Sequence, residues 1–141
     1  MIVIKMLAVG KPKEPWIESG ISEFATRLSS QCKLTCEWVS DDQQLLRQLA
    51  KERSVVLLDP LGKQRNSEDF AKWLMTALVA GGSRLTFVIG GADGLPPEAK
   101  SAFPEMISLS PLTFTHQMVR LILAEQVYRA FEINRGSPYH R

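Results

Sequence analysis

The 141-residue sequence predicts a single-domain α/β sandwich (residues 1–141) whose mostly parallel sheet has about five strands. Strand-like and helix-like segments alternate from end to end, the pattern of parallel strands joined by helices. The run SVVLLD at residues 54–59 is continuously apolar, which is typical of a strand covered on both faces. No apolar run approaches the roughly 20 residues of a membrane-spanning helix. We therefore expect no membrane association.

In the first half, the pattern predicts strands at residues 2–9, 34–39 and 54–59. Pro15 suits the first turn of a helix that we expect to extend to about residue 28. Asp41 or Asp42 can cap a second helix, which we expect to end near residue 53. Each helix lies between two strands, as a parallel sheet requires.

In the second half, Pro60, Gly62 and Asn66 predict a loop after the third strand. A helix is predicted at residues 67–80, where Gly81 and Gly82 stop it. Further strands are predicted at residues 84–89 and 106–109, and a final helix at residues 116–133. This order completes the alternating pattern.

Apolar residues cover more than half of the final helix, which is more than one sheet face can bury. They are Met118, Leu121, Ile122, Leu123, Ala124, Val127, Tyr128 and Phe131. Two interpretations remain open, namely a helix deeply buried in its own domain and a helix that also forms a homodimer interface. Glu125 and Arg129 have the i, i+4 spacing of an ion pair.

A glycine-rich loop follows the fourth strand in LTFVIGGADGLPP, residues 85–97. Gly94 is followed by Leu95 rather than Lys, which excludes a P-loop. The G-G-x-x-G spacing also fits the dinucleotide fingerprint poorly. A loop of exposed backbone without clustered positive charge suits a nucleoside-like ligand, whereas a tight turn is the simpler alternative.

The formal net charge of +2 does not by itself indicate a nucleic-acid-binding protein, although both ends of the chain are locally basic. These ends could be solvated surfaces or an RNA footprint. Cys32 and Cys36 have no accompanying ligand cluster, so we expect reduced thiols and no metal.

The segments IGGADGL, LSPLTFTHQMVRLILAEQVYRA and PYHR closely resemble the RlmH family of SPOUT methyltransferases, and LAVGK and VVLLDPLGK match in kind and order. The resemblance covers essentially the whole chain. It implies a C-terminal trefoil knot, a homodimer and the cofactor S-adenosyl-L-methionine. The implied reaction is methylation of N3 of a pseudouridine in the helix 69 loop of 23S ribosomal RNA, on assembled ribosomes in the cytoplasm.

Carried onto this sequence, the resemblance implies cofactor binding at three segments. They comprise Leu58, Gly90 and the run Leu109, Ser110, Pro111, Leu112, Thr113 and Phe114. The sequence departs from the family pattern at Thr115, where proline is usual, which predicts a slightly looser cofactor loop.

The predicted reaction removes a weakly acidic imide proton, so a base or an anion-stabilising site is expected. His116 falls in the first turn of the last helix, where the helix dipole favours the neutral imidazole. His116 is therefore the candidate catalytic residue, with helix capping or packing as the alternative. Tyr139, His140 and Arg141 are chemically suited to contact RNA, and we expect one subunit's tail to complete the partner's site.

Two other functions remain compatible with the residues. A non-catalytic nucleotide- or RNA-binding adaptor could use the same glycine loop and basic ends. A SPOUT methyltransferase that acts on transfer RNA is the second alternative, because a cofactor pocket does not encode the substrate.

Overall fold

The computed structural model describes residues 1–140 and contains a five-stranded parallel sheet with strand order β2-β1-β4-β3-β5. The strands are β1 (Val3–Val9), β2 (Lys33–Val39), β3 (Val55–Gln64), β4 (Arg84–Ile89) and β5 (Met106–Ser108). The helices are α1 (Pro15–Leu28), α2 (Asp42–Leu49), α3 (Ser67–Ala80), α4 (Pro97–Ala102) and α5 (His116–Asn134). The predicted α/β alternation and parallel sheet are confirmed.

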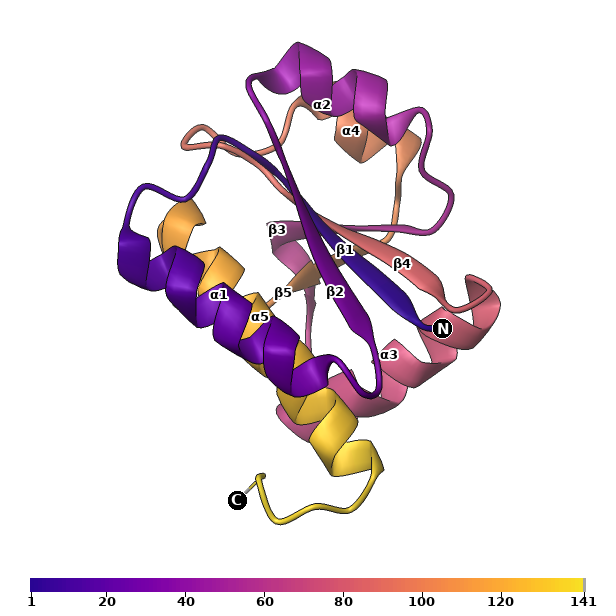
Figure 1. Ribbon diagram of the computed structural model, residues 1–141. Coiled ribbons are helices and arrows are strands. Elements are labelled where there is room, and N and C mark those ends of the chain that lie inside the picture. The colour runs from indigo at the N-terminus through magenta and orange to yellow at the C-terminus, as the bar shows by residue number, and fades with distance from the viewer. Residues whose placement is uncertain (141) are drawn as a thin grey trace.

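Helices cover both faces of the sheet. Helices α1, α3 and α5 lie on one face, and α2 and α4 lie on the other (Figure 1). Successive side chains of β1 alternate between the two layers, since Ile4 and Met6 join the larger core cluster whereas Leu7 joins the smaller one. Burial on both faces explains the continuous apolar runs in the sequence. Within residues 1–140, no helix has the length and apolar character needed to cross a membrane.

Helix α2 is shorter than predicted and ends at Leu49 rather than near residue 53. The chain turns there, with the Glu52 amide donating to the Leu49 carbonyl at 3.1 Å. This turn brings the Glu52 carboxylate to 2.6 Å from Lys5 Nζ on β1. A tertiary ion pair thus replaces the last predicted helical turn.

Strand β3 is longer than predicted, so the loop expected at Pro60 and Gly62 is wrong. Ile107 of β5 pairs with both Leu58 and Lys63 in the parallel sense. Because a strand residue has one neighbour on each side, β5 lies between the two parts of β3. A Cβ on Gly62 would lie 2.5 Å from the Ile107 carbonyl carbon, so only glycine fits this crossing.

Helix α5 packs between α1 and α3, in addition to lying on the sheet (Figure 1). A Cβ on Gly20 of α1 would lie 2.6 Å from Leu121 Cδ1, so this glycine allows a close approach of the two helices. On the other side, Asn134 Nδ2 donates to the Ala71 carbonyl of α3 at 3.3 Å. Much of the apolar surface of α5 is therefore covered within the chain.

Candidate active site

A cavity of about 660 Å³ lies where β3, β4 and β5 end and α5 begins. Its volume is in the range of small-molecule sites, and the carboxyl ends of parallel strands are where open α/β sheets bind ligands. All eight predicted cofactor residues line it, together with His116; the eight are Leu58, Gly90, Leu109, Ser110, Pro111, Leu112, Thr113 and Phe114. The fold therefore brings together three segments that are distant in sequence.

The glycine loop after β4 forms one wall of this cavity. Gly94 has a φ of 83°, and its amide donates to the Gly91 carbonyl at 3.0 Å. A Cβ on Gly90 would lie 2.4 Å from the Gly94 carbonyl carbon. The tight turn therefore accounts for Gly90 and Gly94, and the number of glycines is not by itself evidence for a ligand.

The segment between β5 and α5 forms another wall and contains two hydrogen bonds of its own. Ser108 Oγ donates to the Ser110 carbonyl at 3.1 Å, and the Leu112 amide donates to Ser110 Oγ at 3.0 Å. Thr115 caps α5, because its Oγ1 accepts from the Met118 amide at 3.1 Å. Proline could not supply this cap, and the looser cofactor loop expected from Thr115 stays a prediction.

His116 is the first residue of α5 and lines the cavity. Burial first, and then the positive charges of Arg120 and Lys13, hold the pKa of the His116 imidazole below its usual value. The ring is therefore neutral near pH 7 and able to accept a proton. Thr115 performs the capping that was the alternative interpretation of His116.

Asp59 lines the cavity, although the sequence did not single it out. Its side chain is buried, and Lys100 Nζ of α4 lies 2.9 Å from its Oδ2. Burial opposes ionisation, but the bonds from Lys100 and from the Leu61 amide hold the pKa of Asp59 below its usual value. A charged residue at the end of an apolar strand was the available signal.

Arg120 was also not predicted as a site residue, because in the sequence it is only one of several basic residues near the C-terminal end. Its side chain is fully buried. Nη1 donates to the Gly10 carbonyl at 2.6 Å, Nη2 to the Val9 carbonyl at 2.9 Å and Nε to the His116 carbonyl at 3.2 Å. The guanidinium also lies 4.8 Å from the Trp38 ring centroid. It joins the end of β1 to the first turn of α5, beside the cavity.

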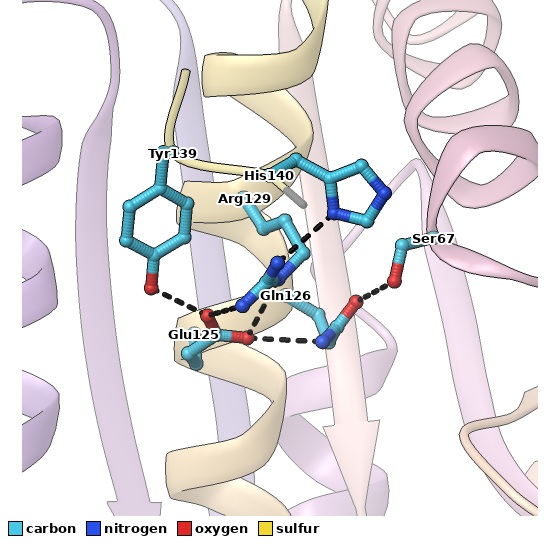
Figure 2. Close-up of polar contacts among 6 residues, drawn as sticks. All are labelled: Ser67, Glu125, Gln126, Arg129, Tyr139 and His140. Atoms are coloured by element: carbon cyan, nitrogen blue, oxygen red, sulfur yellow. Dashed lines mark hydrogen bonds and ion pairs between the residues drawn. The ribbon is translucent and has the colours of Figure 1, made fainter. Parts of the chain in front are cut away.

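The C-terminal tail folds back onto α5 of the same chain (Figure 2). The Tyr139 hydroxyl donates to Glu125 Oε2 at 2.6 Å, and Arg129 Nη2 donates to the same oxygen at 2.8 Å, which confirms the predicted i, i+4 pair. Burial, followed by the Glu125 bond, raises the pKa of Tyr139 to about 12. Tyr139 therefore stays protonated at physiological pH.

His140 lies between a cation and an anion at the end of the tail. Arg129 Nη1 is 2.9 Å from its Nδ1, and Glu68 Oε1 is 2.6 Å from its Nε2. Because arginine can only donate, Nδ1 accepts and the proton on Nε2 points to Glu68. Arg141, the third predicted RNA contact, lies outside the described residues. In residues 1–140, no cluster of three His, Cys, Asp or Glu side chains could hold a metal ion.

Comparison with known proteins places the chain among methyltransferases. A family model described as "Predicted SPOUT methyltransferase" matches residues 2–140. The chain is 48% identical over 141 residues to the ribosomal RNA large subunit methyltransferase H of Protochlamydia amoebophila, covering 100% of both proteins. It is 38% identical to the protein of the same name from Latilactobacillus sakei, covering 98% of this chain and 99% of that one.

Solved structures support the fold. A methylase family protein from Neisseria gonorrhoeae aligns with a TM-score of 0.52 at 13% identity, covering 89% of this chain and 81% of that one. A structure titled for 2-OH methylation of C/U34 on tRNA aligns with a TM-score of 0.51 at 11% identity, covering 96% and 98%. At such low identity these matches concern the architecture alone.

Proposed function

Because this chain belongs to the RlmH family of SPOUT methyltransferases, we propose that it methylates 23S ribosomal RNA with S-adenosylmethionine as the methyl donor. The proposed target is N3 of a pseudouridine in the helix 69 loop, on assembled ribosomes in the cytoplasm. Residues 1–141 would act as one catalytic domain. That the chain is a methyltransferase follows from its family, and the choice of target is the proposal.

The observation that carries the proposal is the cavity at the carboxyl ends of β3, β4 and β5. Leu58, Gly90 and the 109–114 segment, which the family pattern assigns to the cofactor, all line it. The walls combine apolar side chains such as Ile89 and Val119 with loop backbone, which fits an adenosyl group. When bound, S-adenosylmethionine supplies a methyl group on a sulfonium whose leaving group is a neutral thioether, chemistry that requires no metal.

The chain's own residues would position the reactants and remove the imide proton. His116 is neutral and lines the cavity, so it can accept the imide proton from the nucleobase of the bound substrate. Arg120 and the Thr115 cap fix the helical turn that carries His116. Positioning of this kind supplies much of the rate in a displacement reaction.

We propose further that the enzyme is a homodimer and that its C-terminal third forms a trefoil knot. The passage of β5 between two parts of β3 supports the knot. The strongly exposed side chains of Trp16 and Leu112 support a partner surface near the start of α1 and the cavity. In the dimer, Tyr139, His140 and Arg141 of one subunit would contact RNA at the other subunit's cavity.

The proposal is tested by incubating the pure protein with labelled S-adenosylmethionine and ribosomes that lack the modification, and then mapping the methyl group. Transfer to N3 of the helix 69 pseudouridine is the expected result. An isolated helix 69 hairpin serves as the control and should be a poor substrate, because the proposal has the dimer recognise an assembled ribosomal surface rather than an RNA sequence. Methylation of transfer RNA, or no transfer to ribosomes, would refute the proposed target.

A further inference from the structure

A second cavity, of about 420 Å³, adjoins the first. The two share a wall, because the 107–110 segment and Phe114 line both. The rest of the second cavity comes from the end of β3, the start of α3, α5 and the tail residue His140. A ligand in this cavity would therefore lie beside the proposed cofactor and the tail.

Most polar groups around the second cavity already have partners. Ser67 Oγ donates to Gln126 Oε1 at 2.8 Å (Figure 2), and Asn66 Oδ1 accepts from the Asp69 amide at 2.8 Å. The Glu68 carboxylate faces His140. The side chains of Lys63 and Arg65, the two cationic residues of the lining, form no ion pair within residues 1–140.

Arg65 leaves hydrogen-bonding capacity unused. Its guanidinium lies 5.0 Å from the Trp73 ring centroid, and Nη1 is buried without a hydrogen-bond partner among residues 1–140. An unsatisfied buried N–H is destabilising, so rotation of this flexible side chain onto an acceptor in the cavity would recover a bond. Lys63 forms no ion pair within the described part of the chain.

We propose that the second cavity binds a backbone phosphate of the substrate RNA through Arg65 and Lys63. Guanidinium and ammonium groups are suited to phosphate oxygens, and arginine can bind two of them at once. The shared wall would place this phosphate next to the nucleotide that enters the cofactor cavity. The inference rests on the proposed function, because it takes RNA as the substrate.

The test measures kcat and KM for ribosomes at several KCl concentrations and fixed Mg²⁺. Arg65→Gln should raise KM about 10-fold, the effect of losing one charge-assisted bond, while cofactor affinity measured by calorimetry stays unchanged. The slope of log KM against log salt should fall by about 0.7, the value for one phosphate contact on a single strand. Arg65→Lys should retain most of the slope.

Two further variants distinguish the loss of a phosphate contact from a folding defect. Lys63→Gln changes an exposed side chain and should reduce the slope by a similar amount. Arg47→Gln removes the same charge from the exposed surface of α2, on the opposite face of the sheet, and should leave KM and slope unchanged. Wild-type KM and slope in both Arg65→Gln and Lys63→Gln would overturn the phosphate site.

Co-sedimentation with ribosomes separates this inference from the proposed function, because it requires no turnover. Binding that depends on Arg65 without methyl transfer would overturn the proposed function and support the phosphate site. Methyl transfer that is indifferent to Arg65 and Lys63 would overturn the phosphate site alone. Absence of both binding and transfer in the wild type would overturn both.

Discussion

Replacing Arg120 with methionine tests whether the buried guanidinium stabilises the fold. Methionine keeps much of the length of the arginine side chain but removes three donors, which bind the Val9, Gly10 and His116 carbonyls at 2.6–3.2 Å. Loss of a hydrogen bond to a charged group destabilises by about 1.5–3 kcal/mol. Burial of the guanidinium without a carboxylate partner carries a desolvation cost. Methionine removes this cost, which offsets several kcal/mol of the loss. We therefore expect a net loss of about 3 kcal/mol.

Urea denaturation measures this change. For an m-value of about 2 kcal/mol/M, the midpoint should fall by about 1.5 M. Arg47→Met is the matched control, because Arg47 is exposed on α2 and its substitution should change stability by less than about 0.5 kcal/mol. If Arg120→Met and Arg47→Met unfold at the same urea concentration, the three bonds merely balance the desolvation of the guanidinium, and our reasoning is wrong.

Three further predictions concern the strand crossing, the ion pair of the buried Asp59 and the tail. Gly62→Ala should lower stability by about 3 kcal/mol, seen as a fall of the melting temperature near 10 °C, because its Cβ would meet the Ile107 backbone at 2.5 Å; an unchanged melting temperature would contradict the crossing. Asp59 has a depressed pKa in the fold, so the bond to Lys100 contributes stability above the unfolded pKa of 3.8, and this contribution is lost as pH falls through the folded value. The stability difference between wild type and Asp59→Asn, measured by urea titration, should shrink below about pH 4; a constant difference would refute this linkage. Deleting residues 139–141 should abolish methyl transfer to ribosomes while calorimetry shows intact cofactor affinity, and full turnover would disprove the role of the tail.

The sequence predicted the layered architecture because it depends on local patterns. The apolar run 54–59 predicted burial on both faces of the sheet, and both faces are covered. The segments at Leu58, Gly90 and 109–114 could be proposed as one site, because the carboxyl ends of parallel strands lie at one edge.

Features that depend on distant partners could not be predicted in this way. Pro60 and Gly62 have the chemistry of a loop, and their place in β3 depends on Ile107, far along the chain. A single charged residue such as Arg120 is usually on the exposed strip of a helix, and only the carbonyls at the end of β1 reveal its burial. Such long-range contacts leave no local pattern in the sequence.

The position of β5 between two parts of β3 also bears on how the molecule is made. Ribosomal synthesis proceeds from the N-terminus, so both flanking parts of β3 exist before the three residues that fill the gap between them. The residues that close the cavity, 109–116, follow later still. A nascent chain therefore has no complete cavity until residues 106–119 have been synthesised and have taken their place. The time at which affinity for the proposed cofactor appears during refolding would therefore measure the rate of this final folding step.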